Sequence, residues 1–377
     1  MKFKEVIGQQ GLKEKLLLSV QEGRISHAQL FFGNEGCGNL ALALAYAQYI
    51  CCTQRLPDDS CGRCPACNKI QKLIHPDLHF AVPVNTTKEI SSEKKPITDH
   101  FLNPWREALI ASPYLTEQQW YELLGIENKQ GNISVQEASR IIEKLNFKPY
   151  ESDYKVMIVW LPERMNAAAA NRLLKLIEEP PSNTLFLLVS KTPEQIIKTI
   201  RSRAMPVRVP PIDERALTEA LKERNNLTEA HAGKIARLSN GNYSEALRLI
   251  ENESEQNDYF DCFCQLMRLA FIADGIALMN WAEETATLGR EQQKNFLLYA
   301  GRLIRESFML HCNAKDVVYL LGAEESFAAN FSPYVHKKTA DEIHRQLNLA
   351  LAHIGQNGNA KIIFTDLAIC MARLIKK

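Results

Sequence analysis

The feature that most constrains this chain is a glycine-rich turn between an apolar run and a helical pattern. The run Ala28–Phe32 is followed by Gly33-Asn34-Glu35-Gly36-Cys37-Gly38. This spacing matches the GxxxxGK[ST] loop, whose backbone N–H groups cradle phosphates where a strand turns into a helix. The turn therefore predicts an α/β nucleotide-binding fold.

The two side chains that give such a loop its chemistry are absent. Asn39 stands where a lysine would reach the β- and γ-phosphates, and Leu40 stands where a hydroxyl would hold Mg²⁺. We interpret Gly33, Gly36, Gly38 and Asn39 as a degenerate P-loop, with ATP either not bound or not hydrolysed by this chain. Capture of a phosphate by backbone N–H groups alone stays open.

A second magnesium-holding position is also apolar. The run Lys155–Trp160 occupies the place of the strand that should end in acidic residues, but it continues into Leu161. The nearest acid, Glu163, follows Pro162. Together with Leu40, this second replacement predicts that hydrolysis is absent.

Cysteines crowd into one short segment, and their spacing predicts a metal site. Cys52, Cys61, Cys64 and Cys67 supply four thiolates, the number and softness that suit a closed tetrahedral zinc site. Such a site is structural, because four protein ligands leave no position for water. Spacing alone does not choose between Cys51 and Cys52, and a set of free surface thiols is the alternative.

Short apolar runs alternate with helical patterns over the first two hundred residues, which predicts a mostly parallel sheet covered by helices. One helix is expected around Ala170, Leu173, Leu174 and Ile177, capped by Asn166 and ended by prolines. The expected strands are 28–32, 78–82, 155–160, 185–189 and 207–209.

The chain divides into three expected parts. An α/β domain covers 1–211, with the zinc module at about 51–68 and a polar, then aromatic, insertion at about 84–131. A small helical unit covers 212–253, and an all-helical region covers 254–377. At 377 residues the chain is long enough for several cores.

Charge and hydropathy bear on nucleic-acid and membrane binding, and any DNA contact would have to come from a local patch or from partner chains. The formal net charge is +1, so no global basic field indicates nucleic-acid binding by the chain alone. The most apolar stretch near the start, 40–46, is too short to span a bilayer, and the first residues lack an apolar signal region. We therefore expect a cytoplasmic protein with no membrane partner.

Several motifs together resemble those of the bacterial DNA polymerase III clamp-loader subunits. They run in order from residue 3 to about 211 and include the glycine loop and the four cysteines. The others are Ile7-Gly8-Gln9, Gly23-Arg24-Ile25-Ser26-His27-Ala28, the stretch from Asn171 to Pro181, and Ile200-Arg201-Ser202-Arg203.

This resemblance implies an AAA+ architecture: a RecA-like domain with its zinc module, a helical lid over 212–253, and a helical collar for oligomerisation over 254–377. The replacements at Asn39, Leu40 and Trp160 resemble the ATPase-inactive member of the family and not the gamma/tau ATPase. The implied partners are gamma/tau and delta subunits in a hetero-oligomeric ring. The sliding clamp and primer–template DNA are implied partners through that complex.

The resemblance also gives Arg203 a role. From spacing alone, Arg203 is a solvated or salt-bridged surface residue. In the family, an arginine at this position is a finger that acts in trans on ATP bound by the neighbouring subunit, and we expect Arg203 to do the same. The family motif is Ser-Arg-Cys, and here Ala204 replaces the cysteine.

Two alternatives remain from the sequence. An independent ATPase of the gamma/tau type would bind ATP tightly and hydrolyse it with Mg²⁺. A zinc-bearing DNA-binding scaffold would bind DNA without partners, in a salt-sensitive and sequence-independent way.

Overall fold

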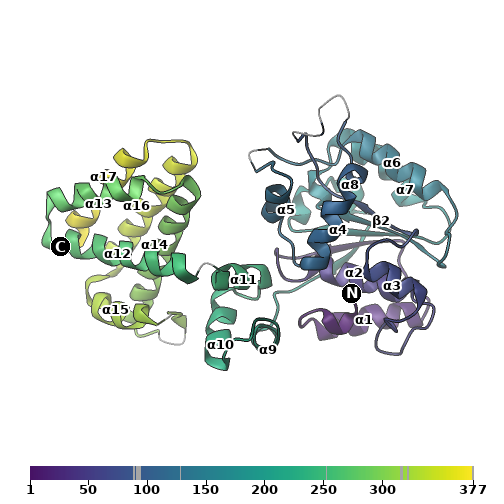
Figure 1. Cartoon of the computed structure of the whole chain (residues 1–377), viewed down its shortest axis with the longest axis horizontal. Coiled ribbons are helices and arrows are strands. Elements are labelled where there is room, and N and C mark those ends of the chain that lie inside the picture. The colour runs from purple at the N-terminus through teal and green to yellow at the C-terminus, as the bar shows by residue number, and fades with distance from the viewer. Residues whose placement is uncertain are drawn as a thin grey trace. The chain divides into compact units, whose positions relative to one another are not determined.

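The computed structural model divides the chain into two compact units, residues 1–247 and 248–377 (Figure 1). It describes residues 1–87, 90, 95–127, 129–251, 253–314, 317–320 and 322–375, and the side chains of 253–257 are excluded. The expected insertion falls partly outside these ranges, at residues 88, 89, 91–94 and 128, and so does residue 252 at the end of the expected helical unit 212–253. The division into three parts at 211 and 253 stays a prediction.

The first unit is built on a parallel sheet of five strands within the described residues, in the order β2-β3-β4-β1-β5. The bounds are β1 Ala28–Phe32, β2 Leu78–Ala81, β3 Lys155–Trp160, β4 Thr184–Ser190 and β5 Met205–Arg208. The expected α/β fold and its strands are confirmed, with ends that differ by one or two residues. Because β1 lies between β4 and the edge strand β5, the glycine turn follows an interior strand of the sheet.

Helices cover both faces of this sheet, as the figure shows (Figure 1). Leu30, Met157 and Leu188 belong to one buried cluster with α6 (Val135–Asn146) and α7 (Ala167–Glu178). The opposite face contacts α2 (Asn39–Cys51), in which every residue is buried. The central strands β3 and β4 are therefore buried on both sides, which explains their nearly continuous apolar runs. Around α2 lie α1 (Gln10–Gln21) and α3 (Pro65–Gln71).

Helix α7 begins and ends where the sequence predicts. The Asn166 side chain accepts a hydrogen bond from the backbone N–H of Ala169 (2.8 Å), so it caps the first turn. Ala170, Leu173 and Ile177 are buried against the sheet. The helix ends at Glu178, two residues before Pro180.

The segment between β2 and β3 forms a helical insertion. It holds a 3₁₀ turn, η3 (Thr98–Phe101), and helices α4 (Leu102–Ala111) and α5 (Glu117–Leu123). An isolated antiparallel bridge between Val84 and Asn132 closes its base. The insertion therefore leaves and re-enters the domain at one point, next to the end of β2.

The rest of the first unit consists of 3₁₀ turns and short helices. A 3₁₀ turn η1 (Phe3–Glu5) opens the chain, and η4 (Pro162–Arg164) and η5 (Pro193–Gln195) follow β3 and β4. Helix α8 (Lys198–Arg201) precedes β5. Helices α9 (Glu214–Asn225), α10 (Glu229–Leu238) and α11 (Tyr243–Glu251) then make up the region expected as the lid.

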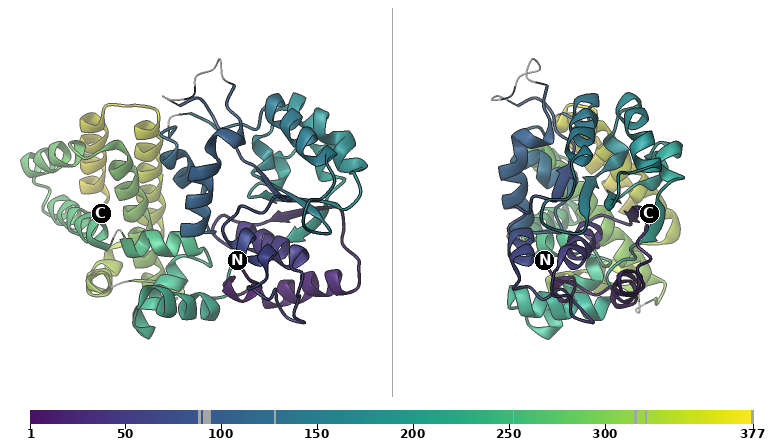
Figure 2. Two further views of the ribbon diagram at one scale, coloured as in Figure 1. Left: turned by 45° about the vertical axis from the view of Figure 1, so that its right-hand side comes forward. Right: turned by 90° about the vertical axis from the view of Figure 1, so that its right-hand side faces the viewer.

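The second unit is helical throughout its described residues, as expected (Figure 2). Its elements are α12 (Glu253–Ile272), α13 (Gly275–Ala286), α14 (Arg290–His311), α15 (Ala323–Phe331), η7 (Ser332–Tyr334), α16 (Lys337–Gly355) and α17 (Ala360–Ile375). Trp281, Phe296 and Phe364 meet in its buried core, with ring centroids 6.0–6.3 Å apart. Among the described residues, no helix has the length and apolar character needed to cross a membrane.

Candidate functional sites: a degenerate P-loop, a four-cysteine cluster and an arginine

The glycine loop has the conformation that its spacing predicts. Gly38 caps α2 with φ 99°, a left-handed conformation that suits glycine. A Cβ on Gly33 would lie 2.2 Å from the carbonyl oxygen of Val209, so a side chain at that position would clash with backbone. The loop therefore retains its P-loop shape.

The amide of Asn39 binds the loop itself. Its Nδ2 donates to the carbonyl oxygens of Gly33 (2.8 Å), Asn34 (3.4 Å) and Ser190 (3.3 Å). These bonds fasten the loop to the end of β4. The next residue, Leu40, is buried. The two positions that would hold phosphate and Mg²⁺ thus serve the stability of the domain.

The end of β3 is apolar as well. The Trp160 ring packs against Trp105 of α4, with centroids 5.1 Å apart. Glu163, the nearest acid after β3, accepts hydrogen bonds from the backbone N–H groups of Lys191 (3.0 Å) and Thr192 (3.2 Å). Its carboxylate therefore holds the turn after β4.

The space beside the loop is largely filled by side chains. A cavity of about 30 Å³ remains there, enough for one or two water molecules. Its lining includes Gly36, Gly38, Leu40, Tyr114, Trp160 and Lys191. The cation in this lining, Lys191, is already paired with Glu35 and Glu117, and Asn39 replaces the lysine that would bind the phosphates of a nucleoside triphosphate.

A charged network closes the same edge of the sheet. Glu117 of α5 is bound by Arg164 Nε (2.6 Å) and Nη2 (3.0 Å) and by Lys191 Nζ (2.8 Å). Its backbone N–H donates to the Glu35 carboxylate of the glycine loop (2.7 Å). Burial would raise the pKa of Glu117, but hydrogen bonds from Arg164, Lys191 and Tyr121 outweigh it and lower the pKa to about 2. Glu117 is therefore an anion that ties α5 to three neighbouring segments.

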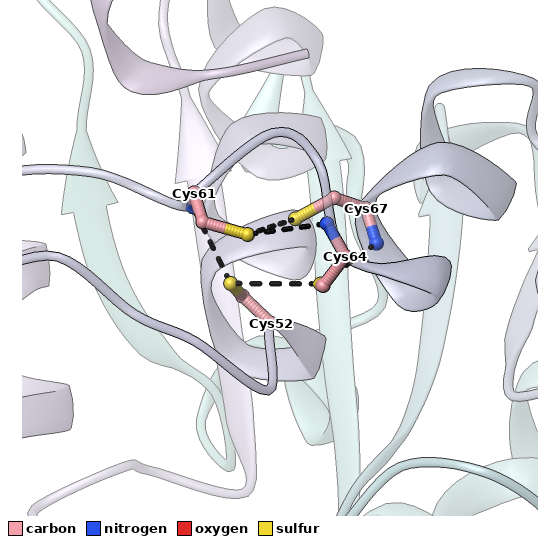
Figure 3. Close-up of side chains that lie close together, drawn as sticks. All are labelled: Cys52, Cys61, Cys64 and Cys67. Atoms are coloured by element: carbon pink, nitrogen blue, oxygen red, sulfur yellow. Dashed lines mark hydrogen bonds between the residues drawn. The ribbon is translucent and has the colours of Figure 1, made fainter.

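The four predicted cysteines converge on one point (Figure 3). Cys52 follows α2, Cys64 caps α3, Cys67 lies in α3, and Cys61 lies in the loop between these helices. All four Sγ atoms lie within 4.8 Å of one another, with Cys52–Cys64 at 4.0 Å and Cys61–Cys67 at 3.9 Å. Cys52, Cys61 and Cys64 also accept hydrogen bonds from backbone N–H groups three to nine residues away, at 3.3–3.4 Å.

This donor set fits zinc. Four sulfurs bonded tetrahedrally at about 2.3 Å lie about 3.8 Å apart, close to the two separations above. Disulfide sulfurs lie about 2.05 Å apart, and all four cysteines are free. Four cysteine sulfurs, placed by the end of α2 and the start of α3, could therefore hold one ion in a closed site.

Cys51 lies outside this cluster, although its sequence position left the choice open. Its thiol accepts a hydrogen bond from the Ser152 hydroxyl (3.6 Å). Burial raises the pKa of Cys51 to about 12, so it stays a neutral thiol. The structure therefore places Cys52 in the cluster with Cys61, Cys64 and Cys67. Cys51 is buried outside it.

Arg203 lies between α8 and β5, at the edge of the domain. Its side chain is 33% exposed and forms an ion pair with Glu178 (3.1 Å), and its Nη1 donates to the carbonyl oxygen of Thr199 (2.9 Å). Ala204, where the family motif has cysteine, is buried in the core beneath the sheet. The guanidinium is thus oriented from two sides and remains reachable from solvent.

Sequence reasoning missed the residues that fill the nucleotide side of the loop. Tyr114 and Glu117 come from the insertion, and Asn242 comes from the turn before α11. The one available signal was the cluster of aromatic residues around Trp105 and Trp120, which the sequence places between two strands without a stated role.

A parallel α/β domain with a P-loop-like glycine turn, a four-cysteine cluster and helical regions after it defines a class of P-loop α/β proteins of the AAA+ type. The family model described as "DNA polymerase III, delta subunit" matches residues 8–213, more than half of the chain. The chain therefore belongs to this family, within the DNA polymerase III clamp-loader proteins.

The relatives point to the delta-prime type of subunit. The chain is 28% identical to DNA polymerase III subunit delta′ of Escherichia coli K12, over 85% of this chain and 81% of that protein. It is 26% identical to the Bacillus subtilis delta′ subunit, over 62% of this chain and 57% of that protein. The gamma/tau subunit of Mycobacterium tuberculosis H37Rv is 25% identical, over 66% of this chain and 36% of that protein.

Among solved structures, a DNA polymerase III gamma subunit-related protein from Thermotoga maritima aligns with 97% of this chain and 99% of its own, at 15% identity and a TM-score of 0.39.

Proposed function

We propose that this chain is an ATPase-inactive stator of the DNA polymerase III clamp loader, which supplies an arginine finger to ATP on the neighbouring gamma/tau subunit. The observation that carries this proposal is the closed P-loop. Asn39 bonds to the loop's own carbonyls, and only about 30 Å³ of free space remains beside it. A subunit with such a site contributes to hydrolysis through its neighbours.

The placement of Arg203 supports its part in this proposal. A finger must reach across an interface and still be held in one orientation. Arg203 meets both needs, because it is partly exposed and is bonded to Glu178 and Thr199. An ion pair with a half-exposed carboxylate contributes at most about 1 kcal/mol, so phosphate oxygens can compete with Glu178 for the guanidinium.

The cysteine cluster has a structural role in the same proposal. Cys52, Cys61, Cys64 and Cys67 would hold one Zn²⁺ ion, which would fix the end of α2 and the start of α3 relative to each other. No chemistry of the loader is assigned to this metal.

The partners follow from the proposed role. Gamma/tau and delta subunits would join this chain in a ring through its helical region 254–377. The sliding clamp and primer–template DNA would be reached through the assembled complex. A formal net charge of +1 is consistent with DNA being gripped mainly by the assembly.

The test is the ATPase rate of a reconstituted loader, stimulated by clamp and primed DNA, with Arg203→Ala in this chain only. We expect a loss of roughly a thousandfold at the affected site, the lower end of measured finger effects. Arg201→Ala is the matched control, because Arg201 is an exposed arginine two residues away whose Nη1 bonds only to the carbonyl oxygen of Pro193 (3.3 Å) among the interactions described.

The loader experiment, together with assays of the purified chain, separates the alternatives. An unchanged rate in an intact complex would remove the finger and leave an architectural subunit. Mg²⁺-dependent hydrolysis by the purified chain would favour a gamma/tau-type ATPase. Salt-sensitive DNA binding by the chain alone would favour a DNA-binding scaffold.

A further inference from the structure

The helical region expected as the lid is bonded directly to the glycine loop. The backbone N–H of Tyr243 donates to the carbonyl oxygen of Gly36 (3.0 Å), and the Cys37 thiol donates to that of Gly241 (3.4 Å). A Cβ on Gly36 would lie 1.7 Å from Asn242 Oδ1. The turn before α11 therefore packs against backbone that a phosphate-binding loop would keep open.

One residue of the insertion joins four segments at this point. Tyr114 is 3% exposed, and its hydroxyl accepts a hydrogen bond from the Ile7 N–H (2.8 Å). Its ring would lie 3.3 Å from a Cβ on Gly38, and it packs edge-on against Tyr243 with centroids 4.9 Å apart. Its carbonyl oxygen accepts a hydrogen bond from the Ser244 hydroxyl. The N-terminal segment, the loop and the start of α11 are thus fastened through Tyr114.

The insertion is itself fixed at the positions where a nucleotide site has lost its polar residues. Trp105 packs on Trp160 and on Trp120, each at 5.1 Å, and Trp120 Nε1 donates to the carbonyl oxygen of Pro83 (2.9 Å). Tyr114 and Leu40 line the same small cavity. The apolar replacements and the inserted aromatic residues are therefore complementary surfaces.

We propose that Tyr114, carried by the insertion of about 84–131, is a built-in lock: it occupies the space beside the degenerate P-loop and holds the helical region up to residue 247 closed on it without nucleotide. In a P-loop protein that binds nucleotide, the ligand itself bridges such segments, so its release loosens them. In this chain Tyr114 makes the bridge, and it cannot dissociate because it is a residue of the chain. The lock extends the proposed stator role, because it keeps this subunit in one state during the ATP cycle of its neighbours.

The test is hydrogen–deuterium exchange of the full chain, with and without millimolar MgATP. In the wild type, we expect slow exchange in 239–247 that ATP leaves unchanged. In Tyr114→Ala, we expect exchange there to rise roughly tenfold or more, because the buried ring and the hydrogen bond from the Ile7 N–H to its hydroxyl no longer oppose local opening. Exchange in β1, β3 and β4 should stay slow. Tyr150→Ala is the matched control, because Tyr150 is 82% exposed in the same unit.

A second variant and a second probe cover the possibility that Tyr114→Ala fails to fold. Tyr114→Phe keeps the ring and removes only the acceptor for the Ile7 N–H, so it should raise exchange by a smaller factor. Cys37 is buried under Gly241 and should react with a thiol reagent faster in both variants, as read at that cysteine by peptide mass spectrometry.

Two results would overturn the lock: protection of 239–247 by ATP in the wild type, or unchanged exchange and Cys37 reactivity in both folded variants. Neither would affect the finger, which is tested through Arg203 and the neighbour's ATPase rate. Conversely, an Arg203→Ala loader with normal activity would leave the lock intact.

Discussion

The glycine loop and the cysteine cluster lie at opposite ends of the same helix, α2, and show two fates of a binding site. At the start of α2 the loop keeps its backbone shape, but its polar side chains are replaced and its space is filled by the chain itself. At the end of α2 the donors are complete, and the four sulfurs converge with room for an ion. A retained backbone shape is therefore weak evidence that a site binds a ligand, whereas a converging set of donor atoms is strong evidence.

The largest effect should come from the cysteine end. Cys64→Ser should abolish binding of one zinc per chain and lower the free energy of unfolding of the first unit by several kcal/mol, because structural zinc and folding are coupled. Metal content by mass spectrometry and thermal unfolding would measure this.

Cys51→Ala is the matched control, since Cys51 is buried next to the cluster without joining it. It should keep full zinc and lose only about 1 kcal/mol for a small cavity. Zinc lost from Cys51→Ala and retained by Cys64→Ser would reverse the assignment of the ligands.

A smaller effect should come from the network that closes the loop end. Glu117→Gln should cost about 2–3 kcal/mol at neutral pH, because Arg164 and Lys191 lose their shared charged partner. Urea unfolding would measure it. Glu122→Gln is the control, an exposed acid of the same helix that should change stability by less than about 0.5 kcal/mol.

The effect of Glu117 should depend on pH in one direction. Its pKa is lowered to about 2 in the folded chain from a usual value of 4.5. Its contribution to stability is therefore complete above pH 4.5 and is lost as the pH falls toward 2. The difference between wild type and Glu117→Gln should shrink on going from pH 7 to about pH 3. A difference that grows with acidity would contradict the ion network.

The sequence predicts those structural features that depend on a local residue pattern. The five strands, the Asn166 cap and three of the cysteines (Cys61, Cys64 and Cys67) are each specified by spacing within one short segment, whereas the fourth cysteine is limited to Cys51 or Cys52. The residues that fill the space beside the glycine loop are not specified in this way. Tyr114 contacts Ile7 and Ser244, which lie 107 and 130 residues away in the chain. Such contacts arise from packing of the whole domain and leave no periodic signal. Cys51 likewise makes a distant contact, because its thiol accepts a hydrogen bond from the Ser152 hydroxyl about a hundred residues away.

The smallest effect should come from Asn39, which stands where a P-loop has its lysine. Asn39→Ala removes an amide that donates to Gly33, Asn34 and Ser190, and should cost about 1–2 kcal/mol in urea unfolding. The loss is limited because Asn39 Oδ1 has no hydrogen-bond partner among the described residues, so its removal also relieves a buried polar atom.

A matched control for this variant lies in the second unit. Asn330→Ala removes an exposed amide whose Nδ2 donates to the carbonyl oxygen of Ser326 (3.0 Å), and it should change stability by less than about 0.5 kcal/mol. If Asn39→Ala were as neutral as this control, the amide would not be stabilising the loop. The closure of the nucleotide end would then depend on Tyr114 and Glu117 alone.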